Sequence, residues 1–129
     1  MPWYYDQMSG RLYRPDCTEV TTGSPRSGFG PGYSGDFRHA NYPAAENLPF
    51  GGPIPKGFYN IGRPYHHARH RPLTMDLSRS ANGGPDRTDL QIHGDNIRQP
   101  GNASAGCIIF GPTIREQIAA SPDRLLIVR

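Results

Sequence analysis

The sequence predicts one mainly β domain that has long loops and one short helix. The chain has 129 residues, which is enough for one hydrophobic core and hardly enough for two. Its 16 Gly and 14 Pro residues divide it into short pieces. Several of these pieces alternate apolar and polar residues with the period of two that is typical of strands. We therefore expect residues 1–129 to form a single domain.

Composition and charge exclude several classes of protein. A net charge of +3 and an aromatic content of 10% argue against a disordered chain. The longest apolar runs are far shorter than the roughly 18 residues of a membrane span, so we expect no membrane insertion. The basic residues follow no helical period and do not alternate with aromatic residues, so we expect no nucleic-acid partner.

The first half of the chain predicts a hairpin and then a long loop. Residues 3–8 and 11–14 favour strands, and the turn dipeptide Ser9-Gly10 separates them. Residues 21–55 are interrupted by Gly and Pro throughout and are expected to be a loop. A loop of that length within a small domain is usually functional.

The most positive stretch, residues 63–71, is expected to be a solvated loop. His66 and His70 within it have the i, i+4 spacing of some zinc sites. Pro64 and Pro72 lie on either side, however, and argue against the helix that such a site requires. We predict neither a metal nor a cofactor.

The second half predicts strands and the helix. Residues 56–61, 73–77 and 90–93 are expected strands, and residues 81–86 are an expected turn. Residues 107–110 form a short apolar run.

The predicted helix begins at Pro112, because proline fits the first turn of a helix, and it ends near Ser121. Ile114 and Ile118 lie on one face of this helix. Residues 124–129 form the last predicted strand.

Histidine and cysteine lie at the ends of two neighbouring predicted strands. His93 ends one strand and Cys107 begins the next apolar run. A thiolate is a strong nucleophile, and an imidazole close by accepts its proton. Gly106 lets the backbone approach a substrate, so that amides near Cys107 can face an oxyanion. The alternative is that His93 and Cys107 are both ordinary core residues.

Two motifs carry a resemblance to a known family. His-Gly-Asp at residues 93–95 and Ala-Ser-Ala-Gly-Cys-Ile at residues 103–108 resemble the YkuD-type L,D-transpeptidase catalytic domain, especially its type VI secretion effector branch. Residues 32–35, Asn47 and residues 52–59 occur in the order seen in that branch. The resemblance extends over nearly the whole chain.

The resemblance implies a YkuD-like β-sandwich or barrel-like core and an antibacterial enzyme that acts on peptidoglycan stem peptides. It makes Cys107 the nucleophile and His93 its base, while the backbone of Gly94 helps to orient His93. Ser104 and Gly106 match the motif that surrounds the cysteine. The expected reaction cleaves the L,D bond of a tetrapeptide stem, as an L,D-carboxypeptidase, or exchanges the terminal D-Ala, as an L,D-transpeptidase.

Other positions have open roles. Asp95 either binds loop amides or helps to position His93 or substrate. Tyr33, Ser34 and Asn47 either line a groove for the stem peptide or have structural roles. Typical cell-wall enzymes of this family have histidine where this chain has Ala105, which leaves the binding of the acceptor amine undefined.

The first residues contain neither a basic region nor an apolar region of the kind found in a signal peptide. With the resemblance, this predicts a protein that is made in the producer cytoplasm, secreted by the type VI system and active in the periplasm of a target cell. The expected partners are stem peptides, a periplasmic immunity protein and a delivery component.

Two alternatives to this enzyme remain. One is a wall-binding or structural domain with a degenerate site. The other is a papain-like cell-wall amidase, although in those enzymes the cysteine precedes the histidine along the chain, and here His93 precedes Cys107. We also expect Cys17 to be dispensable and not to be disulfide-bonded to Cys107.

Overall fold

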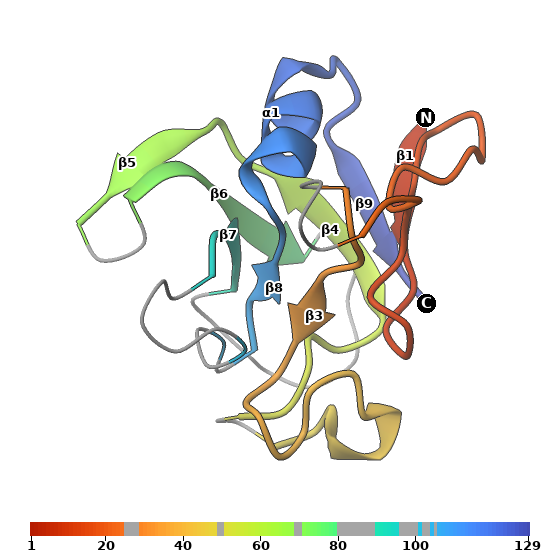
Figure 1. Cartoon of the computed structure of the whole chain (residues 1–129), viewed down its shortest axis with the longest axis vertical. Helices are drawn as coiled ribbons and strands as arrows, with labels where there is room; N and C mark the ends of the chain where they lie inside the picture. The colour runs from red at the N-terminus through yellow and green to blue at the C-terminus, as the bar shows by residue number, and fades with distance from the viewer. Residues whose placement is uncertain are drawn as a thin grey trace.

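The computed structural model is mainly β (Figure 1). It describes residues 1–24, 29–48, 51–68, 71–79, 90–95, 101, 104 and 106–129. Within these ranges, nine strands form one sheet, accompanied by one α-helix and a short 3₁₀ helix. The turn predicted at residues 81–86 lies outside the described residues.

The strands are short, and β6 is the longest of them. In chain order the elements are β1 (Pro2–Tyr5), β2 (Leu12–Tyr13), β3 (Tyr33–Ser34), η2 (Pro43–Ala45), β4 (Gly57–Ile61), β5 (Tyr65–His67), β6 (Arg71–Arg79), β7 (Gln91–His93), β8 (Ile108–Ile109), α1 (Pro112–Ala120) and β9 (Leu125–Val128). The spatial order is β2-β1-β9-β4-β6-β7-β8-β3, with β5 paired to β6. Two neighbouring pairs are parallel, β1 with β9 and β7 with β8.

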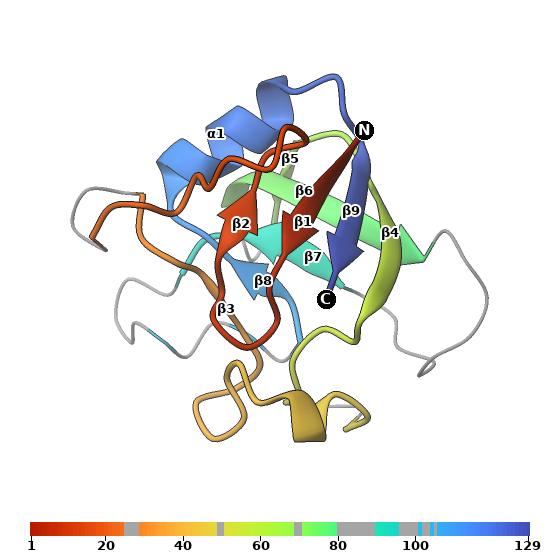
Figure 2. The same ribbon diagram turned by 90° about the vertical axis from the view of Figure 1, so that its right-hand side faces the viewer.

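The sheet curls until its two ends meet, as Figures 1 and 2 show together. Gly10 precedes β2 and Gly32 precedes β3, the strands at opposite ends of the spatial order. The Gly32 amide donates to the Gly10 carbonyl at 2.9 Å. Across the interior, the rings of Tyr5 and Phe110 pack edge to face with centroids 5.8 Å apart. The predicted barrel-like core is therefore confirmed.

Alternating side chains of the strands fill this core. In β1, Trp3 and Tyr5 are buried, and Leu126 and Val128 are buried in the neighbouring β9. This alternation follows from the period of two along a strand.

The predicted helix is confirmed as α1, which packs against β6 and lies across one end of the curled sheet (Figure 1). Pro112 occupies its first turn, where a missing N–H costs no hydrogen bond. Ile114 and Ile118 are fully buried on the face turned to the core. Burial of each side chain contributes about 2 kcal/mol to holding the helix in place.

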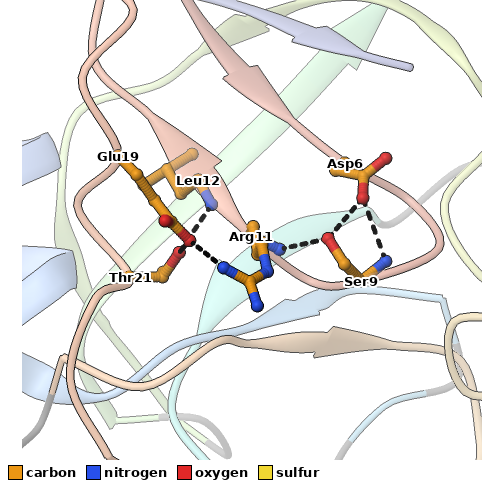
Figure 3. Close-up of polar contacts among 6 residues, drawn as sticks. All are labelled: Asp6, Ser9, Arg11, Leu12, Glu19 and Thr21. Atoms are coloured by element: carbon orange, nitrogen blue, oxygen red, sulfur yellow. Dashed lines mark hydrogen bonds and ion pairs between the residues drawn. The ribbon is translucent and has the colours of Figure 1, made fainter.

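The predicted hairpin is confirmed, with shorter strands than expected, and polar contacts fix its turn (Figure 3). The Asp6 carboxylate accepts hydrogen bonds from both the amide and the hydroxyl of Ser9. Beyond the turn, Glu19 accepts from Arg11 and from the Thr21 hydroxyl, each at 3.0 Å. These contacts tie the chain that follows β2 back to the turn.

Two expectations for loops were wrong. The loop predicted at residues 21–55 contains β3 and η2, which are too short to show a period in the sequence. The stretch at residues 63–71 contains β5 and the start of β6. Leu73 in β6 has a φ of 59°, and the β5–β6 register shifts beside it, so a bulge interrupts the alternation there.

Candidate active site

Two parallel strands bring the predicted catalytic residues together. In the ladder between β7 and β8, Ile92 is paired with Ile108 and His93 with Ile109. Extended by one residue toward the N-terminus, this register sets Cys107 beside Gln91. Gln91 lies two residues before His93 in β7. Residues two apart in a strand face the same side of a sheet. Cys107, directly before β8, and His93, at the end of the adjacent β7, therefore lie two residues apart along one face of the sheet.

Hydrogen bonding defines the tautomer of His93. The side chain is fully buried, and its Nδ1 lies 2.8 Å from the Gly94 carbonyl oxygen. A carbonyl only accepts, so Nδ1 carries the hydrogen. In the neutral ring, Nε2 is then the basic nitrogen. The imidazole is thus held in the form that a general base requires.

The Ser104 hydroxyl shapes the loop that leads to Cys107. It donates to the Cys107 carbonyl at 2.7 Å. It also accepts from the amides of Gly106 and Gly35, each at 3.0 Å. Gly106 has a φ of 142°, which side chains rarely adopt. One buried hydroxyl therefore joins three backbone groups around the cysteine.

Ser34 supports the same loop from β3. Its hydroxyl donates to the Gly106 carbonyl at 3.0 Å and accepts from the Ile54 amide at 2.7 Å. The side chain is fully buried. Of the two roles open for Ser34, the structure gives it the structural one, because a buried hydroxyl with both partners inside the protein does not line a groove.

A hydrogen bond brings together Asp95, in the loop after β7, and Tyr33 of β3. Asp95 accepts from the Gly101 amide at 3.1 Å through each of its oxygens, and from the Tyr33 hydroxyl at 2.6 Å. These contacts give Asp95 the role of binding a loop amide and tie the loop after β7 to β3. Asn47 lies exposed beyond η2, and no contact within the described ranges joins it to His93 or Cys107.

Arg115 lies close to the site, although its place in the predicted helix is more typical of a surface residue. Its guanidinium donates to the carbonyls of Phe110 at 3.0 Å and Pro72 at 2.9 Å. A Cβ placed on Gly94 would lie 2.8 Å from Arg115 Nη2, so the guanidinium packs against the residue that follows His93. Burial lowers the pKa of Arg115. The helical position, one turn after Pro112, was the only signal for it.

A second group missed by the sequence reasoning lies beside Cys107. Tyr65 donates to Asp76 Oδ1 at 2.7 Å, and Gln91 Nε2 contacts both Asp76 Oδ1 at 3.1 Å and the Tyr65 hydroxyl at 3.2 Å. Removal from water, the hydrogen bond to Asp76, and the negative charges of Asp76 and Cys107 raise the pKa of Tyr65 to about 12. The sequence offered one signal for this group: Gln91 lies two residues before His93, and side chains two apart in a strand share a face.

The remaining sequence predictions concern cysteine, metal and membrane. Neither cysteine forms a disulfide; Cys17 is exposed and Cys107 is buried. Within the described ranges, no cluster of three or more His, Cys, Asp or Glu side chains is arranged to hold a metal ion. His70 and Ala105 lie outside those ranges. The part of the chain that the structure describes contains no helix with the length and apolar character to cross a membrane.

Comparison with known proteins places this site in a family. The model described as the Tlde1 domain matches residues 30–124. Comparisons with curated proteins and with solved structures gave no significant match. The Tlde1 name points to type VI secretion L,D-transpeptidase effectors. Because the match includes His93, Cys107 and every strand from β3 to β8, the chain belongs to the Tlde1 domain family.

Proposed function

We propose that this protein is a cysteine enzyme that cleaves the L,D bond of peptidoglycan tetrapeptide stems. The observation that carries the proposal is the β7–β8 pairing, which sets Cys107 one step from a His93 that is held in its basic tautomer. Membership of the Tlde1 family supports the same chemistry.

In the proposed reaction, the Cys107 thiol gives its proton to His93 Nε2, and the sulfur attacks the carbonyl that joins the third residue of the stem to D-Ala. The C–N bond breaks, and His93 returns the proton to the departing amine. The stem remains as a thioester on Cys107. Water then hydrolyses the thioester, or the amine of a D-amino acid displaces the sulfur.

The proposed oxyanion donors are backbone amides near Cys107, in a loop whose shape is fixed in part by the Gly106 amide donating to Ser104. Ser104, Ser34 and Gly94 then act through the backbone and hold the reacting groups in place. Tyr33 and Asp95 close one side of the loop. No residue beyond Cys107 and His93 is required to form or break a covalent bond.

We further propose that the protein acts in the periplasm of a target cell after type VI delivery from the producer cytoplasm. Its proposed partners are a delivery component and a periplasmic immunity protein. The family membership supports this biological setting.

Purified tetrapeptide muropeptides, incubated with and without a free D-amino acid and analysed by mass spectrometry, test the activity. We expect tripeptide products in the first case and exchanged tetrapeptides in the second. His93→Gln should lower both by at least about a hundredfold. A sacculus-binding protein without activity would leave the muropeptides unchanged and would overturn the proposal.

A further inference from the structure

Tyr65, Asp76 and Gln91 form a polar cluster on three neighbouring strands, β5, β6 and β7. Asp76 and Gln91 are directly paired in the β6–β7 ladder. The Asp76 carboxylate is exposed, and both donors, the Tyr65 hydroxyl and Gln91 Nε2, bind its Oδ1. The cluster therefore holds one carboxylate in a fixed orientation at the surface.

This cluster belongs to the same face as the reacting groups. Paired residues in a ladder face the same side of a sheet. Asp76 is paired with Gln91, and the β7–β8 register sets Gln91 beside Cys107. The three side chains thus form a row across β6, β7 and the residue that directly precedes β8.

The cluster can still bind one positively charged hydrogen-bond donor, through Asp76 Oδ2. Among the described residues, no side chain donates to Asp76 Oδ2, and no Lys or Arg forms an ion pair with Asp76. An ionised carboxylate with one oxygen already fixed by two donors presents its other oxygen to a cationic donor. A primary ammonium group fits this oxygen, because it carries a positive charge and three hydrogens.

We propose that Asp76, oriented by Tyr65 and Gln91, binds a primary ammonium group of the substrate beside Cys107 and thereby determines specificity. This assignment rests on the proposed function. The ammonium group has two possible sources in that reaction. One is the side-chain amine of the third residue in the donor stem, and the other is the amine of the acceptor that resolves the thioester.

The donor source is tested with two tetrapeptide muropeptides, one with a free side-chain amine and one with that amine acetylated. The wild type should cleave the free form with a kcat/KM roughly tenfold higher, as expected for a hydrogen bond to a charged group. Asp76→Asn should cleave both forms equally, at the rate of the acetylated form. Asp16→Asn is the matched control, because it removes an exposed charge in the turn after β2 and should keep the wild-type preference.

The acceptor source is tested by adding a free D-amino acid and measuring the ratio of exchanged to hydrolysed product. If Asp76 binds the acceptor, Asp76→Asn should lower this ratio roughly tenfold. Tyr65→Phe removes one of the two groups that orient Asp76 and should shift the same quantity in the same direction by a smaller factor. Thermal melting of each variant checks that it is folded.

The outcomes test the role of Asp76 and the proposed enzymatic activity separately. A changed donor preference or a changed product ratio in Asp76→Asn supports the assignment and identifies the source of the ammonium group. Wild-type values for both quantities in Asp76→Asn and Tyr65→Phe overturn the assignment and leave the proposed function intact. A wild-type protein that releases no D-Ala overturns the proposed function itself.

Discussion

At the scale of single residues, the site depends on side chains that hold the backbone as much as on those that react. The Ser104 hydroxyl has three backbone partners, and the Ser34 hydroxyl donates one further bond to the same loop and accepts one from the Ile54 amide. A buried polar group without partners costs free energy, so each of these contacts restricts the conformations open to the loop. The position of Cys107 is therefore set by serines that do not react in the proposed mechanism.

Ser104→Ala should lower the free energy of unfolding by about 2–3 kcal/mol, because it leaves buried backbone groups without partners. Catalytic activity should fall further than stability explains, since the loop loses its fixed shape. Ser78→Ala is the matched control, as Ser78 is exposed on β6, and its effect should stay within about 0.5 kcal/mol. Urea unfolding measures both variants. Equal midpoints for the two would contradict the role assigned to Ser104.

Tyr65 offers a pH-dependent test at the same scale. Its folded pKa of about 12 lies above the ordinary value of 10.0. The native state therefore holds the phenolic proton more tightly than the unfolded state does. The corresponding contribution to the free energy of unfolding is fully present below pH 10 and is lost as the pH rises toward 12.

Ultraviolet titration of phenolate, taken as the difference between wild type and Tyr65→Phe, measures this pKa. We expect a midpoint near 12 in the wild type and a lower one in Asp76→Asn, which removes a hydrogen bond and a charge from Tyr65. An ordinary midpoint for Tyr65 in the wild type would show that the cluster beside Cys107 does not form in solution.

At the scale of elements, the parallel pairing of β7 with β8 creates the site. Parallel neighbours require a long connection, and here residues 94–107 supply it. That connection carries Asp95, Ser104 and Gly106, which anchor it to β3 and to Cys107. The candidate site is thus concentrated in the segment that the topology makes long.

Elements with a clear period were predictable, and those that depend on pairing were not. The face of α1 that contains Ile114 and Ile118 follows from helical spacing, and β9 follows from its aliphatic run. The β5 strand contains Tyr65 and two histidines, which show no apolar alternation. It forms because β6 offers it a partner, and this information is not local in the sequence.

The same distinction applies to the site. His93 and Cys107 stand out as reactive residue types at strand ends, so a motif identified them. Asp76 and Tyr65 became candidates only through the register of β6 with its neighbours. Ser34 was predicted as a possible groove residue from its motif, but the β3–β8 pairing buries it. It therefore has no exposed surface for a ligand.

At the scale of the whole molecule, closure of the sheet depends on two glycines that touch. Gly10 has a φ of 75°, and a Cβ on it would lie 1.9 Å from the Gly32 carbonyl oxygen. The backbone there has no room to give way without separating the two ends of the sheet. Gly32 leads directly into β3, which pairs with β8 and supports the Cys107 loop.

Gly10→Ala should lower the free energy of unfolding by more than about 3 kcal/mol, because it combines backbone strain with a clash against backbone. Gly101→Ala is the matched control. Gly101 has a similar φ of 88°, but a Cβ there meets nothing within 4 Å, so strain alone should cost about 1 kcal/mol. Urea unfolding compares the two, and equal losses would show that contact between the ends of the sheet does not stabilise the fold.

The most direct test of the account is the amount of free D-Ala released from purified tetrapeptide muropeptides. Wild-type protein and Cys17→Ala should release D-Ala at the same rate, because Cys17 is an exposed thiol in the turn after β2. Cys107→Ala should lower the rate at least about a thousandfold while its thermal unfolding remains cooperative. Release at the wild-type rate by folded Cys107→Ala would contradict the assignment of Cys107 as the nucleophile.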